Sequence, residues 1–313
     1  MTRHLVIGAG ASFAECKAAN LPDELCLPLT GSFARKLWKD YNPAFVLRVY
    51  LQESGVDIPA GADVRDIFFN LERTRPTEFS IELFFAYLWN QRERFPGEFE
   101  NLTYHGILNP MAFMLSQGLW NHPGSIVDAP LKLSPRVAQK LDGGDLILNL
   151  NYDTLFEIGA TQAGKSIVFL PNTPSPTDIC IAKPHGSFNL VVNSEKRSFA
   201  FGKLDWPGIP QPADGSRNYR GFVPPRLNKS FTEHPVAHMI VKKIRGLRPN
   251  SLAFWGVGLG GSDSDLTELY GDWSATASMI EVINPDKTIA MKLERVFGKP
   301  VIHYPDVEDW LKS

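Results

Sequence analysis

The segment His4-Leu5-Val6-Ile7-Gly8-Ala9-Gly10-Ala11-Ser12 is the part of the sequence that most clearly predicts the fold. A buried strand that ends in Gly-x-Gly and starts a helix lets the backbone approach a phosphate, and the helix N-terminus supplies free N–H groups. The usual dinucleotide fingerprint has a third glycine, where this chain has Phe13, and an acidic residue that ends a second strand. Here Asp23 and Glu24 lie in a proline-containing stretch instead. The segment therefore predicts a phosphate-binding turn rather than a hydride-transfer dehydrogenase, with a tight turn that merely needs glycine as the alternative.

Beyond Gly143-Gly144, short apolar strands alternate with helices. The predicted strands are Asp145–Leu150, Ser166–Leu170, Ile179–Lys183, Ser251–Val257, Ile280–Ile283 and Pro300–His303. The predicted helices lie near 152–162, 234–247, 287–296 and 306–312. Unbroken apolar strands separated by helices predict a parallel sheet covered on both faces. We expect the opening strand, His4–Ile7, to join the same sheet.

The region between these two parts has a helical pattern. From about Gly31 to Leu141, apolar residues recur at spacings of three and four, and prolines at 43, 76, 96, 110 and 123 are expected to separate the helices. The fold predicted is α/β, a doubly wound Rossmann-like parallel sheet with an inserted helical subdomain. Its α/β domain comprises residues 1–30 and 142–313, and the insertion comprises residues 31–141.

Composition narrows the class of protein. The chain has 313 residues, of which 43% are apolar, and its 32 basic and 34 acidic side chains give a net charge of −2. This balance argues against a dedicated nucleic-acid binder, which needs an excess of cations to displace phosphate counterions. Three cysteines cannot form a disulfide framework or a four-cysteine zinc site, and no apolar run approaches the ~18 residues of a membrane span. We expect a cytoplasmic protein.

Two patterns imitate known motifs. Gly159–Ser166 matches the phosphate-loop pattern G-x-x-x-x-G-K-[ST], but that motif needs a strand before it and a helix after it. Here the order is reversed, because Tyr152–Ile158 reads as helix and Ile167–Leu170 as strand. His234 and His238 are spaced four apart, but they have no intervening glutamate and no cysteine pair nearby. We therefore expect the Gly159–Ser166 pattern to be a chance match, and His234 and His238 to be surface or capping residues.

Polar residues and glycines follow five predicted strands. They are Gly8–Ser12, Asn151-Tyr152-Asp153, Lys183-Pro184-His185-Gly186-Ser187, Gly256-Val257-Gly258-Leu259 and Asn284-Pro285-Asp286. Ligands of open parallel sheets bind outside the carboxyl ends of the strands, so these segments predict one shared crevice. Any one of them alone could be an Asx turn or a helix cap.

In order from Gly8 to Asp286, this set resembles the sirtuin-like NAD-binding domain. It is most similar to the bacterial branch of NAD-consuming anti-phage defence proteins, such as the effector domain of Thoeris systems. Asn151–Asp153 is similar to the family's Asn-x-Asp element, and Lys183–Ser187 to its Lys-Leu-His-Gly-Ser segment. Phe222–Pro225 with Asn228-Lys229 is similar to a loop of the bacterial branch.

The sequence also departs from the family. Lysine-deacylating sirtuins carry four zinc-binding cysteines, and the three here are scattered at Cys16, Cys26 and Cys180. The family's Gly-Ile-Pro-Asp-Phe-Arg segment is replaced by Leu27–Gly31, and Gly258 stands where the family often has serine. These departures argue against peptide deacylation, but they do not affect the motifs expected to form the nicotinamide-ribose pocket.

The resemblance implies NAD as substrate and a role for each matched position. Asn151 would orient ribose or water, Asp153 would bind the carboxamide, and His185 would act as base. The residues expected to hold NAD are Gly8, Ala9, Gly10, Ala11, Ser12, Gly256, Gly258, Leu259, Asn284 and Asp286. We expect no metal.

The leading hypothesis is an NAD+ hydrolase that releases nicotinamide and ADP-ribose, acting as an NAD-depleting effector in prokaryotic antiviral defence. It would work as a homo-oligomer or with a separate defence-system chain, without direct contact to nucleic acid or membrane. One alternative is an NAD-dependent protein deacylase or ADP-ribosyltransferase. Another is a non-catalytic sensor of NAD-type nucleotides in a larger complex.

Overall fold

The computed structural model describes residues 2–39, 41–117, 131–204, 209–227, 229–258 and 264–313. Within them, seven parallel strands form one sheet in the order β10-β9-β8-β1-β2-β4-β3. The strands are β1 (Arg3–Ile7), β2 (Leu146–Asn149), β3 (Ile167–Phe169), β4 (Ile179–Ala182), β8 (Ser251–Trp255), β9 (Met279–Ile283) and β10 (Ile302–Tyr304). The chain adds strands first on one side of β1 and later on the other, so the direction of winding reverses between β1 and β8. The predicted doubly wound, Rossmann-like sheet is confirmed.

Both faces of this sheet are covered, and the central strands bury apolar side chains on each face. Val6, Leu148 and Phe254 contribute to the core on one face, whereas Ile7 and Ile147 belong to the core on the other. The first face packs against α10 (Pro235–Arg245), α11 (Ser264–Thr276) and α12 (Lys287–Phe297). The second packs against α1 (Ala9–Ala18), α8 (Ser134–Gln139), α9 (Leu155–Gln162) and α13 (Val307–Lys312).

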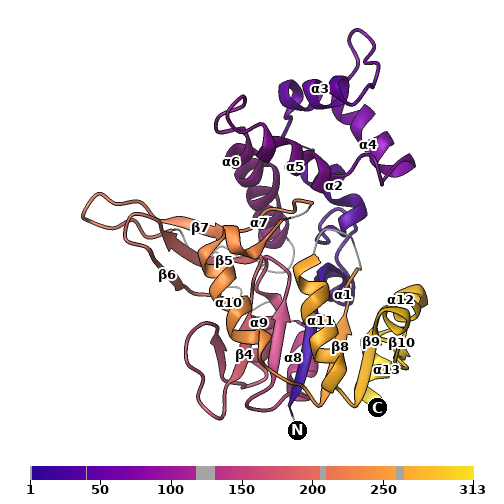
Figure 1. The fold of residues 1–313 in the computed structure, drawn as a ribbon, viewed down its shortest axis with the longest axis vertical. Coiled ribbons are helices and arrows are strands. Elements are labelled where there is room, and N and C mark those ends of the chain that lie inside the picture. The colour runs from indigo at the N-terminus through magenta and orange to yellow at the C-terminus, as the bar shows by residue number, and fades with distance from the viewer. Residues whose placement is uncertain (1, 40, 118–130, 205–208, 228, 259–263) are drawn as a thin grey trace.

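A separate helical block stands over the carboxyl end of the sheet (Figure 1). It contains α2 (Phe33–Leu37), α3 (Ala44–Glu53), α4 (Val64–Thr74), α5 (Ile81–Asn90), α6 (Glu98–Thr103), η2 (Tyr104–Leu108) and α7 (Asn109–Gln117). Its core is aromatic, with Trp38, Phe68 and Phe84 fully buried and in ring contact. The block lies within the stretch expected as an insertion. At the end of that stretch, α8 packs on the sheet with α9.

Pro110 does not separate two helices, contrary to expectation. The chain stays helical from Glu98 to Gln117, and the five residues before α7 form a π-helical turn, Tyr104–Leu108. A proline lacks the N–H that continues an α-helical ladder, and a wider turn before it accommodates the missing hydrogen bond.

Two parts of the structure were not predicted. A second, antiparallel sheet in the order β6-β5-β7 consists of β5 (Gly186–Asn193), β6 (Ser198–Phe201) and β7 (Tyr219–Phe222). Helix α11 was also missed. β6 and β7 have only four residues each, too few to show a period. Their strand conformation depends on pairing with β5, and α11 contains a helix-weakening glycine, Gly271.

Both expectations about misleading motifs agree with the structure. The segment Gly159–Ser166 begins inside α9 and ends just before β3, so helix precedes strand and a phosphate loop is excluded. His234 occupies the N-cap position of α10, and His238 is exposed on that helix. Among the described residues, no helix has the length and apolarity needed to span a bilayer.

Candidate active site

The turns that follow β1 and β8 meet at the point where the sheet reverses its winding. The N–H of Gly8 donates to the carbonyl of Trp255 at 3.0 Å, and that of Gly10 donates to the carbonyl of Gly256 at 2.9 Å. A Cβ on Gly10 would lie 2.8 Å from the Cα of Gly256, and Gly256 itself has φ +62°. These glycines therefore let two loops pack backbone to backbone. The Gly10 amide, expected to face a phosphate, already has a protein partner.

Two cavities open beside this turn and share Ala9 and Gly258 in their linings. The first, here the His185 cavity, has a volume of about 150 Å³. Its lining includes Ser12, Asn151, Asp153 and His185 from the α/β domain, Phe33, Ile81, Glu82 and Met111 from the helical block, and Pro225 and Lys229 from the loop after β7. The second, here the Asn284 cavity, includes Phe13, Lys17, Asn284 and Asp286. The two lie on either side of the first turn of α1.

A chain of three side chains lines the His185 cavity. The amide nitrogen of Asn151 donates to the Gly8 carbonyl at 3.0 Å and to the Ser12 hydroxyl at 2.8 Å, and that hydroxyl donates to Asp153 Oδ2 at 2.8 Å. All three side chains are buried. Because both amide hydrogens of Asn151 are used, its Oδ1 is the atom available to accept from a ligand. Asp153 Oδ1 also accepts the backbone N–H of Leu155 at 3.1 Å, which fixes the start of α9.

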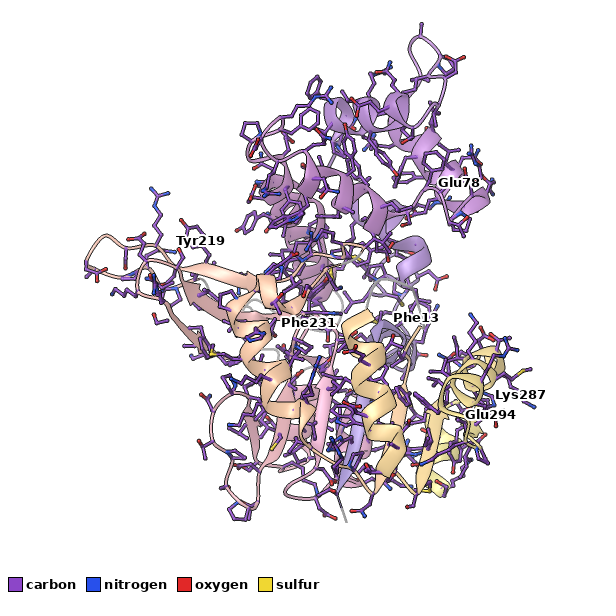
Figure 2. The ribbon with its side chains drawn as sticks, viewed as in Figure 1. Phe13, Glu78, Tyr219, Phe231, Lys287 and Glu294 are labelled. Atoms are coloured by element: carbon purple, nitrogen blue, oxygen red, sulfur yellow. The ribbon has the colours of Figure 1, made fainter. Side chains whose placement is uncertain are left out.

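His185 lies on the turn between β4 and β5. Its Nδ1 is 3.2 Å from the carbonyl oxygen of Leu150. A carbonyl can only accept, so Nδ1 carries the proton and Nε2 is the basic nitrogen of the neutral ring. The ring stacks on Phe231, the residue labelled beside α10 in Figure 2, with centroids 5.8 Å apart and planes at 28°. The next residue, Gly186, has φ +82°, and a Cβ there would lie 2.2 Å from the carbonyl oxygen of Gly221, so glycine is required.

In the Asn284 cavity, the predicted ligand residues also have local structural roles. Asn284 donates to the Val257 carbonyl at 3.2 Å and accepts the N–H of Asp286 at 2.9 Å, which is an Asx turn. Asp286 accepts the N–H of Thr288 at 2.9 Å as the N-cap of α12, and hydrogen bonds from Thr288 hold the pKa of this carboxyl below its usual value. Both residues line the cavity while stabilising its walls.

The structure therefore brings most of the predicted site residues together. Asn151, Asp153 and His185 share one cavity with Gly8, Ala9, Ser12 and Gly258, and Ala9, Gly10, Gly256, Gly258, Asn284 and Asp286 line the other. Ala11 is buried in the core behind the turn. Leu259 lies outside the described residues.

Two charged residues that line the His185 cavity, Lys229 and Glu82, were not among the site residues predicted from the sequence. Lys229 is 5% exposed, and its only signal was the similarity of the loop that contains it to a loop of the bacterial branch. Glu82 is half-buried in the first turn of α5 and comes from the helical block, which carried no motif. The carbonyl of Glu82 accepts the N–H of Leu227 at 3.1 Å, so the helical block and the loop after β7 meet at the cavity. Within the described parts of the chain, no group of three or more His, Cys, Asp or Glu residues could hold a metal ion.

Comparisons with known proteins give a structural likeness only. No family model and no curated protein match the chain. Among solved structures, a Sir2 homologue with NAD is 14% identical, covers 99% of this chain and 86% of its own, and has a TM-score of 0.44. A Sir2 complex with a p53 peptide and NAD+ is 12% identical, with coverage of 99% and 90% and a TM-score of 0.44. A Sir2 homologue mutant with 2′-O-acetyl ADP ribose is 13% identical, with coverage of 99% and 90% and a TM-score of 0.43. At this identity and TM-score, the likeness by itself assigns neither ligand nor activity to the chain.

Proposed function

We propose that this protein is an NAD+ hydrolase that cleaves the nicotinamide–ribose bond to give nicotinamide and ADP-ribose. The observation that carries the proposal is the pair of cavities that meet at Ala9 and Gly258. One contains Asn151 and His185, and the other contains Asn284 and Asp286. A dinucleotide has two halves joined by a diphosphate, so it fits two cavities separated by a glycine turn. The motifs that resemble the sirtuin-like domain lie at the same positions.

The reaction would proceed through an oxocarbenium-like state, as in glycoside hydrolysis. The bond from C1′ of the ribose to the pyridinium nitrogen breaks, and its electron pair leaves with neutral nicotinamide. A water oxygen bonds to C1′ and transfers its proton to Nε2 of His185, which the Nδ1–Leu150 hydrogen bond leaves as the base. Asn151 Oδ1 would accept from a ribose hydroxyl or from the water. Each oxygen of Asp153 accepts one protein hydrogen bond and retains a second lone pair for the carboxamide N–H.

One observation favours water over a protein substrate as the acceptor. The chain has three cysteines, one fewer than the zinc site of lysine-deacylating sirtuins. The proposed biological role, NAD depletion in prokaryotic antiviral defence, rests on the similarity of the motifs to that branch. In this role the chain would act as a homo-oligomer or with a separate defence-system chain.

The test is incubation of the purified protein with NAD, with nicotinamide and ADP-ribose separated and quantified by chromatography. We expect both products in equal amounts, without any peptide present, and their formation about two to four orders of magnitude slower with the His185→Ala variant. Nicotinamide release that requires an acylated peptide would instead indicate a deacylase. NAD binding by calorimetry without turnover, in the isolated protein and in its assemblies, would indicate a sensor.

A further inference from the structure

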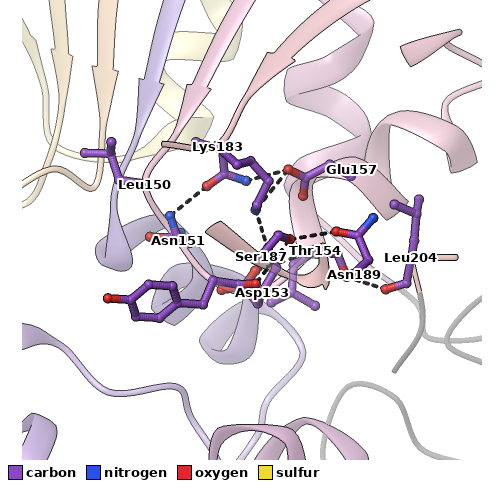
Figure 3. Close-up of polar contacts among 12 residues, drawn as sticks. Leu150, Asn151, Asp153, Thr154, Glu157, Lys183, Ser187, Asn189 and Leu204 are labelled. Atoms are coloured by element: carbon purple, nitrogen blue, oxygen red, sulfur yellow. Dashed lines mark hydrogen bonds and ion pairs between the residues drawn. The ribbon is translucent and has the colours of Figure 1, made fainter. Parts of the chain in front are cut away.

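A charged pair lies completely buried beneath the candidate active site. Lys183, directly after β4, places its Nζ 3.1 Å from Oε1 of Glu157 in the first turn of α9 (Figure 3). Both side chains are 0% exposed. Taking two charges out of water costs free energy that their attraction often fails to recover. The pair therefore needs an explanation other than general stability.

Two hydrogen-bonded routes lead from this pair to the turn that carries Asn151 and Asp153. In the first, Lys183 Nζ donates to the backbone carbonyl of Asp153 at 2.6 Å. In the second, Asn149 donates its amide to Glu157 Oε1 at 2.8 Å and accepts the backbone N–H of Asn151 at 3.0 Å through its Oδ1. The pair thus holds both ends of the turn. Without the pair, the buried carbonyl of Asp153 would lose its bond to Lys183, and the Asn149 side chain that holds the N–H of Asn151 would lose its bond to Glu157.

The same lysine is also part of the histidine turn. The carbonyl of Lys183 accepts the N–H of Gly186 at 3.0 Å, which closes the turn around Pro184 and His185. Lys183 is consequently bonded to both the Asn151–Asp153 turn and the His185 turn.

We propose that Lys183 and Glu157 are positioning residues that set the distance between the Asn151–Asp153 turn and His185. This inference rests on the proposed function and deepens it. Neither side chain reaches the cavity, since neither lines it. Their loss should therefore lower kcat and leave NAD affinity almost unchanged. A displacement of about 1 Å in catalytic groups can cost on the order of 10²-fold in rate.

The decisive variant is Lys183→Met/Glu157→Leu, which removes both charges together and leaves neither buried alone. We expect its kcat to fall on the order of 10²-fold, with KM within about threefold of wild type. If the double variant keeps wild-type kcat, the proposal is wrong.

A control with a similar loss of stability separates positioning from folding. Asp145 is a buried carboxylate at the opposite end of β2, where it accepts the N–H of Arg3 at 2.7 Å and that of Asp142 at 2.9 Å. Asp145→Asn should lower the melting temperature but leave kcat unchanged at temperatures where circular dichroism shows a folded protein. If Asp145→Asn lost as much kcat as the double variant, the fall in kcat would be a consequence of lower stability and not of lost positioning. Should the double variant not fold, Asn149→Ala cuts the second route alone, and wild-type kcat in it would overturn the proposal.

A measurement without turnover keeps this inference separate from the proposed function. Amide hydrogen exchange followed by mass spectrometry reports the protection of the backbone N–H groups of Asn151 and Leu155. We expect faster exchange there in the double variant and wild-type exchange in Asp145→Asn. Unchanged protection in the double variant would refute the positioning role even if the wild-type protein proved not to cleave NAD.

Discussion

Gly10 and Gly256 lie in direct backbone contact, although they are far apart in the sequence. The N–H of Gly10 donates to the carbonyl of Gly256 at 2.9 Å, and a Cβ on either glycine would lie closer than 3.0 Å to backbone atoms of the other turn. Backbone cannot yield as a flexible side chain can. The glycines of this turn are therefore required by the packing of two loops, whatever ligand binds beside them.

This contact changes how a glycine substitution should be tested. We expect Gly10→Val to lower the free energy of unfolding by about 1–3 kcal/mol through overpacking, so that weaker NAD binding in this variant proves nothing. Gly258 borders both cavities, and a Cβ there meets nothing within 4 Å among the described atoms. Gly258→Val should keep the wild-type melting temperature and lose NAD affinity by about tenfold or more. Wild-type affinity in Gly258→Val, measured by calorimetry, would show that NAD does not cross this turn.

Replacement of the proposed base should separate catalysis from binding. We expect His185→Ala to lower NAD turnover by about two to four orders of magnitude, while calorimetry still detects NAD, because the Asn284 cavity is intact. His238→Ala, an exposed histidine on α10, is the matched control and should behave as wild type. Near wild-type cleavage by folded His185→Ala would remove His185 from the mechanism.

Asn151 and His185 should act as a unit. Both line one cavity, and the carbonyl of Leu150, next to Asn151, accepts from the His185 ring at 3.2 Å. We expect Asn151→Ala to lose about as much turnover as His185→Ala, and the double variant to be little worse than either single one, since jointly acting residues are not additive. Steady-state cleavage at saturating NAD provides the comparison. Losses that multiply in the double variant would indicate independent roles.

Catalysis should need no metal. Charge that develops at the ribose can be met by side chains and backbone dipoles, and the cavity residues named above are suited to that task. We expect NAD cleavage to persist in EDTA. Loss of cleavage that zinc or magnesium restores would contradict this prediction.

A buried glutamate in the helical block should make stability depend on pH. Burial raises the pKa of Glu72 on α4 from 4.5 to about 7, and a hydrogen bond from the backbone of Ile81 opposes this only in part. Between these values the folded state keeps a proton that the unfolded chain has released, so stability falls as pH rises through this window. Glu72→Gln should be more stable than wild type at pH 8, on the order of 1–3 kcal/mol.

The measurement for this prediction is urea unfolding across pH 4–8. Glu100→Gln, an exposed glutamate on α6, serves as the control and should follow the wild-type curve. Equal pH dependence in Glu72→Gln and wild type would show that Glu72 is not the group responsible.

The sequence by itself was sufficient for the sheet and for much of the site. β1 and β8 are buried on both faces, so their last residues form unbroken apolar runs, Leu5–Ile7 and Leu252–Trp255, and the pattern is visible without knowing any partner. The ends of the strands could also be located from neighbouring residues alone, because polar residues and glycines follow directly after each apolar run. Parallel strands place their carboxyl ends at one edge, and this general rule brought Asn151 and His185 to the same cavity.

Only the tertiary structure decided which residues from other elements pack around Asn151 and His185. The pairing of Lys183 with Glu157, the entry of Glu82 from the helical block and the contact of Gly10 with Gly256 all join segments from different elements. The spacing of apolar residues within one element cannot predict such contacts, because they depend on how loops and helices pack once the sheet has formed. Periodicity in a sequence reports which face of an element is buried, whereas the partner that buries it is chosen by the packing of the whole chain.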